Sequence, residues 1–231
     1  MRSSSFIRGL DEVLDGGFIR PSTILIAGSA GSGKTNICLQ SLFEAAKNGE
    51  DCVYISLLSE SKMKIIRSLS SFSFFSEDVI DSGKLRICPI SSDTISKGDF
   101  SIFEYMNEHV LSSSPSRVVI DPITILADID STFEERQFRG CELRTFVQNL
   151  FYEFEEKEII LMVTGEIPEE NITSSAWSYM VDTILQLKRK KDRKNVHRYI
   201  EIIKTRGSNF VAGEHLFRID PHGISLIRNC K

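Results

Sequence analysis

The chain is poor in the residues on which disulfide-rich and metal-binding proteins depend. It has five cysteines among 231 residues, an odd number, and no C-x-x-C pair. Its four histidines also lack the spacing of metal ligands. Most of the cysteines fall within or beside expected strands and helices, where a thiol commonly packs as a small apolar side chain. We therefore expect neither a disulfide framework nor a thiolate or histidine metal site.

Long apolar runs are absent as well. No segment reaches the length of a membrane span, and residues 1–5 do not open an apolar signal segment. The expectation is a cytoplasmic protein without membrane insertion. Hydrophobic residues make up 41% of the chain and charged residues 26%, which is ordinary for a globular protein. Because there is no linker or internal repeat, we expect residues 1–231 to form one domain.

Positive charge is scarce in most of the chain and gathers near its C-terminal end. Residues 183–231 hold 12 Lys and Arg against 4 Asp and Glu, a net charge of +8. Residues 1–182 then carry a net charge of −12, which gives the overall −4. A basic end and an acidic body favour either a nucleic-acid patch or head-to-tail packing of identical subunits.

Residues 28–35 match G-x-x-x-x-G-K-[ST], the phosphate-binding loop of nucleotide triphosphatases. Glycines let successive backbone N–H groups turn inward toward phosphate oxygens. Lys34 would bring positive charge to the β- and γ-phosphates, and the Thr35 hydroxyl would ligate Mg²⁺. A buried-strand run at 23–27 and a helical pattern over 37–46 give the motif its expected context. The residues expected to bind nucleotide are Gly28, Ser29, Ala30, Gly31, Ser32, Gly33, Lys34 and Thr35.

Strand-like runs alternate with helical patterns up to Thr164, which predicts parallel β-α-β units with helices on both faces of one sheet. After about Val181 the pattern changes to consecutive strands, which we expect to extend the same sheet in antiparallel fashion. These strands are predicted at 181–187, 199–204, 215–219 and 224–227. The predicted fold class is therefore α/β, with a mostly parallel central sheet and a C-terminal antiparallel extension.

Three carboxylates follow predicted strands, at the edge where open α/β sheets bind ligands. Asp121 ends a buried strand, as a Mg²⁺-orienting aspartate would, although a cap or turn aspartate fits the same place. Glu60 follows the second strand and either orients the attacking water or is a solvated loop residue. Glu166, after the strand ending at Thr164, is a candidate sensor of the γ-phosphate or another loop carboxylate.

Several segments carry a family resemblance. They are Gly9-Leu10-Asp11 followed by Gly16-Gly17, the phosphate loop, 117–121, the segment from Arg198 to Gly207, and the closing residues 213–219 and 222–224. Together they resemble the KaiC family within the RecA superfamily of ATPases, over nearly the whole chain. The resemblance implies a RecA-like P-loop fold, ATP and Mg²⁺ as ligands, ATPase activity, and a homo-oligomer, expected as a hexameric ring, with ATP at each subunit interface.

The same resemblance implies that part of each ATP site comes from the neighbouring subunit. Lys204 and Arg206, with Arg198, would reach the neighbour's γ-phosphate, and Ile219 and Asp220 would lie near its base. A guanidinium supplied in trans neutralises charge that develops on the transferred phosphoryl group. An ordinary exposed arginine at a strand end is the alternative for Arg206.

Two positions depart from the family pattern. Two adjacent glutamates usually follow the second strand, whereas this chain has Ser59 and Glu60, and Pro122 follows Asp121 where serine is common. These changes predict slow hydrolysis. They also leave open a non-hydrolysing ATP-binding scaffold, like the KaiC-like subunit of the archaeal motility motor. No Ser-Thr pair can be placed as an autophosphorylation site, so kinase activity is not predicted.

Nucleic-acid binding through the central loops is not expected. Residues 126–139 contain four acidic residues against two arginines, and residues 165–178 contain three glutamates and no Lys or Arg. DNA binding depends on cations that neutralise phosphates. The basic run Lys188–Lys194 is either a solvated hairpin tip or a contact for nucleic acid or an unidentified protein partner. A recombinase-like role in DNA repair therefore stays open as a third hypothesis.

Overall fold

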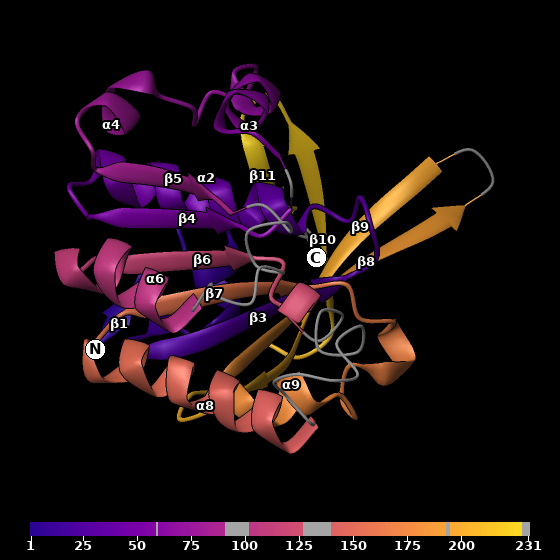
Figure 1. Cartoon of the computed structure of the whole chain (residues 1–231). Coiled ribbons are helices and arrows are strands. Elements are labelled where there is room, and N and C mark those ends of the chain that lie inside the picture. Colours follow the sequence, from indigo (N-terminus) through magenta and orange to yellow (C-terminus); the bar gives the residue numbers. More distant parts are fainter. Residues whose placement is uncertain (59, 91–101, 127–139, 193–194, 228–231) are drawn as a thin grey trace.

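A computed structural model describes the chain except for residues 59, 91–101, 127–139, 193–194 and 228–231 (Figure 1). The strands are β1 (Arg2–Ser3), β2 (Phe18–Ile19), β3 (Ser22–Gly28), β4 (Cys52–Ser56), β5 (Leu85–Pro89), β6 (Arg117–Asp121), β7 (Ile160–Gly165), β8 (Thr183–Asp192), β9 (Asn195–Thr205), β10 (Glu214–Asp220) and β11 (Gly223–Leu226). The α-helices are α1 (Leu10–Val13), α2 (Lys34–Lys47), α3 (Lys62–Leu69), α4 (Glu77–Asp81), α6 (Ile102–His109), α8 (Gly140–Glu156) and α9 (Ala176–Met180).

Nine strands form one sheet in the order β11-β10-β9-β8-β3-β7-β6-β4-β5. From β8 to β5 every neighbouring pair is parallel, whereas β8, β9, β10 and β11 pair in antiparallel fashion. This confirms the predicted α/β class with its antiparallel extension. The phosphate loop follows β3, near the middle of the sheet, so neighbouring parallel strands direct their carboxyl ends toward it.

Helices cover both faces of the sheet, and two apolar clusters fill the space beneath them (Figure 1). Along β3, Ile24 and Ile26 belong to the cluster under α2, while Leu25 and Ala27 belong to the cluster under α8. Because side chains alternate along a strand, a strand covered on both sides must be apolar at every position. That requirement explains the continuous apolar runs that the sequence shows before the loop and before Asp121.

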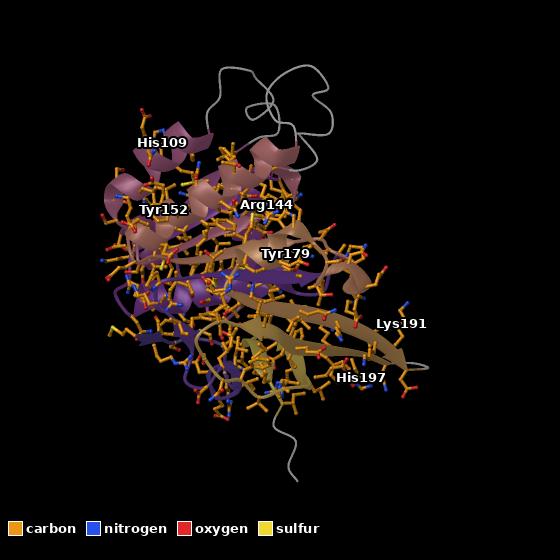
Figure 2. All side chains as sticks on the ribbon, turned by 90° about the horizontal axis from the view of Figure 1, so that it is seen from below. His109, Arg144, Tyr152, Tyr179, Lys191 and His197 are labelled. Carbon is orange, nitrogen blue, oxygen red and sulfur yellow. The ribbon has the colours of Figure 1, made fainter. Side chains whose placement is uncertain are left out.

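The β8–β9 ribbon is longer than the sequence predicts. We expected residues 188–194 to form a hairpin tip, yet β8 continues to Asp192 and β9 begins at Asn195. The ribbon extends beyond the body of the sheet (Figure 1), and Lys191 and His197 lie near its outer end (Figure 2). Polar strands of this kind gain support from cross-strand pairs and not from burial, and such pairs leave no apolar periodicity to read in the sequence.

Among the described helices, none combines the length and the apolar character needed to cross a membrane.

Candidate nucleotide-binding site

The phosphate loop has the backbone that its glycines predict. Gly31 and Gly33 have φ angles of 70° and 111°, in the left-handed region where a side chain is strained. A Cβ on Gly28 would lie 2.5 Å from the carbonyl oxygen of Leu187 on β8. Glycine is therefore required at 28 by the close approach of a neighbouring strand, and at 31 and 33 by the turn of the loop.

Lys34 is buried at the first position of α2, directly after the loop. Its Nζ donates to the carbonyl oxygens of Gly28 at 2.8 Å and Ser29 at 3.0 Å. The carboxylate of Glu166, a candidate sensor of the γ-phosphate or an ordinary loop carboxylate from the sequence, lies 3.6 Å from the same Nζ. The ammonium is thus held over the loop and already has one anionic neighbour, which is the position from which it would meet a phosphate oxygen.

Asp121 is 3% exposed and accepts hydrogen bonds from three hydroxyl groups. Thr35 Oγ1 and Tyr54 Oη donate to Oδ2 at 2.7 and 2.8 Å, and Thr164 Oγ1 donates to Oδ1. Burial, and then the negative charge of Asp121, raise the pKa of Tyr54 well above its usual range, so the phenol stays protonated and donates. The two residues assigned to Mg²⁺, Thr35 and Asp121, are therefore brought into direct contact.

Tyr54 and Thr164 were missed by sequence reasoning, although Thr164 ends a predicted strand. Removing the Tyr54 hydroxyl takes one donor from a buried carboxylate that keeps two others. We expect Tyr54→Phe to lower the free energy of unfolding by about 1 kcal/mol, measured by urea denaturation. Tyr152→Phe, on the exposed surface of α8 (Figure 2), is the matched control and should change it little. Equal effects of the two variants would contradict the assigned role of Tyr54.

A cavity of about 830 Å³ opens beside the loop. It is lined by Lys34, Thr35, Asp121 and Glu166, together with Arg198 from β9 and Ile219 from β10. This volume lies within the usual range for small-molecule and cofactor sites. Residues that are far apart in the chain therefore meet at one cavity, at the carboxyl ends of β3, β6 and β7.

Glu60 is not among the residues that line this cavity. Its Oε1 pairs with Lys64 Nζ at 2.7 Å across one turn at the start of α3, and its side chain is 38% exposed. Leu58, two residues earlier, lines the cavity instead. In this structure Glu60 is thus paired with Lys64 outside the cavity lining, and its role with the attacking water stays a prediction.

Arg198 and Ile219 lie in the cavity of their own chain, whereas the resemblance implied positions facing a neighbouring subunit. A Cβ on Gly33 would lie 3.0 Å from Cδ1 of Ile219, so Ile219 packs against the loop itself. The reason is the antiparallel extension, in which β9 and β10 bring both side chains back to the edge where β3 ends. Asp220 is not among the lining residues and instead pairs with Arg218 at 2.9 Å.

Lys204 and Arg206 lie at the other end of the strands from the phosphate loop, near the amino end of β3. Lys204 Nζ donates to the carbonyl oxygens of Ser178 and Val181 at 2.8 and 2.6 Å. Arg206 donates to the Tyr179 carbonyl oxygen at 2.9 Å and lies 3.4 Å from Asp182, whose own N–H donates to Thr23 at the start of β3. Burial and the neighbouring Arg206 lower the pKa of Lys204. Because β3 separates these cations from the loop by about 15–20 Å, they cannot reach the cavity of their own subunit.

Strand alternation divides the described part of the basic run, residues 188–192, between the two faces of the ribbon. Lys188 lies within 2.6–3.2 Å of carboxylate oxygens of Glu169, Glu201 and Glu214, and Lys190 pairs with Glu214 at 2.6 Å. Burial by itself lowers the pKa of Lys188, but the hydrogen bonds to three glutamates outweigh it and raise that pKa. These two lysines are therefore already neutralised, which counts against a nucleic-acid contact on their face of the ribbon.

Sheet order, loop and buried carboxylate together define the class of this protein: an α/β P-loop protein of the RecA-like fold. A family model described as "ATPase: KaiC" matches residues 3–231, so the chain belongs to the KaiC ATPase family. The resemblance found in the sequence is thereby confirmed, and ATPase activity is supported at the level of the family.

Named relatives agree with this assignment. The chain is 29% identical over 229 residues to circadian clock protein KaiC2 of Synechocystis sp., covering 96% of this chain and 39% of the relative. It is 30% identical over 215 residues to circadian clock oscillator protein KaiC of Prochlorococcus marinus, covering 90% of this chain and 40% of the relative. The chain thus spans about two fifths of these relatives' length. The structure also resembles that of a KaiC-like protein from Pyrococcus horikoshii OT3, with a TM-score of 0.81, 24% identity and 99% of each chain covered.

Proposed function

We propose that this chain is one ATPase unit that binds ATP with Mg²⁺ at its phosphate loop and hydrolyses it slowly within a homo-oligomeric, hexameric ring. The observation that carries the proposal is the buried ammonium of Lys34 beside the Thr35–Asp121 contact, at one cavity. Phosphate release by the pure protein with ATP and Mg²⁺, run beside particle mass with and without ATP, tests it. Release no greater than that of Lys34→Ala would contradict hydrolysis.

The residues present fit Mg²⁺. This ion takes one or two carboxylates together with phosphate oxygens and waters, and a hydroxyl and a carboxylate meet at the cavity 2.7 Å apart. Bound there, Mg²⁺ would neutralise charge on the β- and γ-phosphates. Thr35 would supply the direct ligand. Asp121, held by Tyr54 and Thr164, would fix the orientation of the coordinating oxygens without moving.

Asp121→Asn tests this assignment by binding alone. We expect wild-type protein to bind ATP more tightly with Mg²⁺ than with EDTA, and Asp121→Asn to lose most of that difference while it keeps the metal-free affinity. The reason is that a neutral amide attracts the cation, and orients the oxygens that coordinate it, less strongly than a charged carboxylate does. Titration with labelled ATP measures both affinities. Asp51→Asn, an exposed surface aspartate paired with Lys84, is the control, and an Asp121→Asn protein that keeps the full Mg²⁺ enhancement would refute the role.

Completion of the site by a neighbouring subunit is supported by the positions of Lys204 and Arg206. These cations lie at the amino end of β3, too far from their own loop to act there. Arg206 is 56% exposed, so its guanidinium is available to another subunit. In a head-to-tail contact, the amino end of β3 in one subunit would face the phosphate loop of the next. Lys204 and Arg206 would then place positive charge beside the γ-phosphate, where negative charge develops during transfer.

A second candidate function is a non-hydrolysing ATP-binding scaffold. The observation that favours it is the pairing of Glu60 with Lys64 outside the cavity lining. Among the described residues, the loop that directly follows β4 therefore contributes no carboxylate to the lining of the cavity. Hydrolysis needs a group that orients the attacking water. Prolonged incubation with ATP and Mg²⁺ separates the two functions, because a scaffold would retain bound ATP and an ATPase would convert it to ADP.

A further inference from the structure

We propose that Arg189 is a second cation of the nucleotide site, acting within its own subunit on the terminal phosphate, so that the site prefers a nucleoside triphosphate to a diphosphate. The inference rests on the proposed ATP site and names a residue of the basic run Lys188–Lys194, for which the sequence suggested either a solvated hairpin tip or a contact with nucleic acid or a protein partner. Three observations carry it: the face of the ribbon that Arg189 occupies, its approach to the loop, and the arginine opposite to it.

Arg189 lies on the face of β8 that covers the phosphate loop. Two residues earlier, Leu187 belongs to the apolar cluster under α2, together with Ile200, its partner across the ribbon. Side chains two residues apart on a strand share a face, so Arg189 continues this row outward. Lys188 and Lys190 lie on the other face, where glutamates neutralise them. The ribbon therefore presents Arg189 to the loop and keeps its neighbouring lysines away from it.

The guanidinium of Arg189 approaches the apex of the loop. Its Nη1 lies 3.4 Å from the carbonyl oxygen of Ala30, at the long end of hydrogen-bond distances. A Cβ on Gly31 would lie 3.3 Å from the same nitrogen. Such a long contact uses little of the capacity of a group with five N–H donors in a planar fork. Arg189 is thus exposed and held next to Gly31, a residue that lines the cavity.

The residue directly across the ribbon from Arg189 is another arginine, Arg198. Like charges at opposite positions of neighbouring strands repel one another. Arg198 lines the cavity, and its buried Nε has no hydrogen-bond partner within the described residues. Two facing guanidinium groups, one with an unsatisfied donor, are stabilised by an anion near both of them. The chemistry of the pair therefore calls for an anionic ligand at the loop.

The position of the pair selects the outer end of a phosphate chain. The start of α2 and the residues beside it hold the inner phosphates in a loop of this type, and the lysine reaches the outer ones. Arg189 approaches Ala30 and Gly31 at the apex, away from the start of α2 at Lys34. Its charge is therefore added at the end of the chain, where a triphosphate carries a phosphate group that a diphosphate lacks.

Equilibrium titration of the full chain with ribose-labelled ATP and ADP tests the proposal. We expect Arg189→Gln to weaken ATP binding by about ten- to a hundredfold, the loss typical of a charge-assisted hydrogen bond, and to weaken ADP binding much less. Lys190→Gln is the matched control, since it removes the same charge one residue away on the opposite face, and it should leave both affinities unchanged.

The possible outcomes separate this inference from the proposed function. If Lys34→Ala loses ATP while Arg189→Gln binds both nucleotides like the wild type, the loop is a nucleotide site and Arg189 is no part of it. Equal losses in Arg189→Gln and Lys190→Gln would reduce the effect to general electrostatics and overturn the assignment. Failure of the wild-type protein to bind ATP would remove the proposed function and the inference together.

Discussion

Replacing Lys34 with alanine is expected to abolish detectable ATP binding, and with it all turnover. The ammonium is buried against the loop, bonded to two backbone carbonyl oxygens and 3.6 Å from Glu166. From that position it would make about two charge-assisted hydrogen bonds to the phosphates, each contributing about 1.5–3 kcal/mol. Their loss weakens binding by about 10²–10⁴-fold. Fluorescence titration with labelled ATP measures the affinity, and phosphate release measures the turnover.

Lys47 offers a control on the same helix. It lies at the other end of α2, paired on the surface with Glu44 at 3.1 Å. Lys47→Ala removes the same charge and should bind ATP as the wild type does. Because Lys34 is buried, urea unfolding of both variants must show that each remains folded under the assay conditions. A folded Lys34→Ala protein with wild-type affinity would exclude the loop as the nucleotide site.

The sequence predicts the loop and its support well, because each signal there is local. The glycines, Lys34 and Thr35 form one continuous motif, and Asp121 ends an apolar run whose length is that of a buried strand. In a parallel sheet such ends share one edge, so the meeting of Thr35 and Asp121 follows from the pattern. Local periodicity and shared strand polarity are therefore enough to place this part of the site.

Contacts that depend on strand order were beyond the sequence. Tyr54 lies inside β4, and nothing in its surroundings marks it as a donor to Asp121 until β4 and β6 are known to be neighbours. Arg189 and Arg198 face each other only because the ribbon has one particular register. A shift of one residue would turn Arg189 to the opposite face. Cross-strand pairing, and not composition, thus decides which cations of a basic run face the phosphate loop.

Under the proposed function, the two ends of the sheet's strands carry two unlike halves of a site. The loop, Asp121, Arg189 and Arg198 lie at the carboxyl end of β3, and Lys204 and Arg206 lie at its amino end. Neither half can close on the other within one chain, because β3 lies between them. A ring in which each phosphate loop faces Lys204 and Arg206 of the next subunit would bring the two halves together. Turnover in such a ring therefore depends on assembly.

Arg206→Ala is therefore expected to lower turnover by about 10³–10⁵-fold, the range typical of an arginine supplied in trans, with ATP affinity nearly unchanged. Arg67→Ala, an exposed arginine on α3, serves as the control and should keep both. The decisive measurement mixes two inactive variants. Lys34→Ala subunits keep Arg206 and Arg206→Ala subunits keep the loop, so interfaces that join the intact halves should restore phosphate release. An Arg206→Ala protein with full turnover, or mixed assemblies that stay inactive although both subunits are present, would show that Arg206 does not complete a neighbour's site.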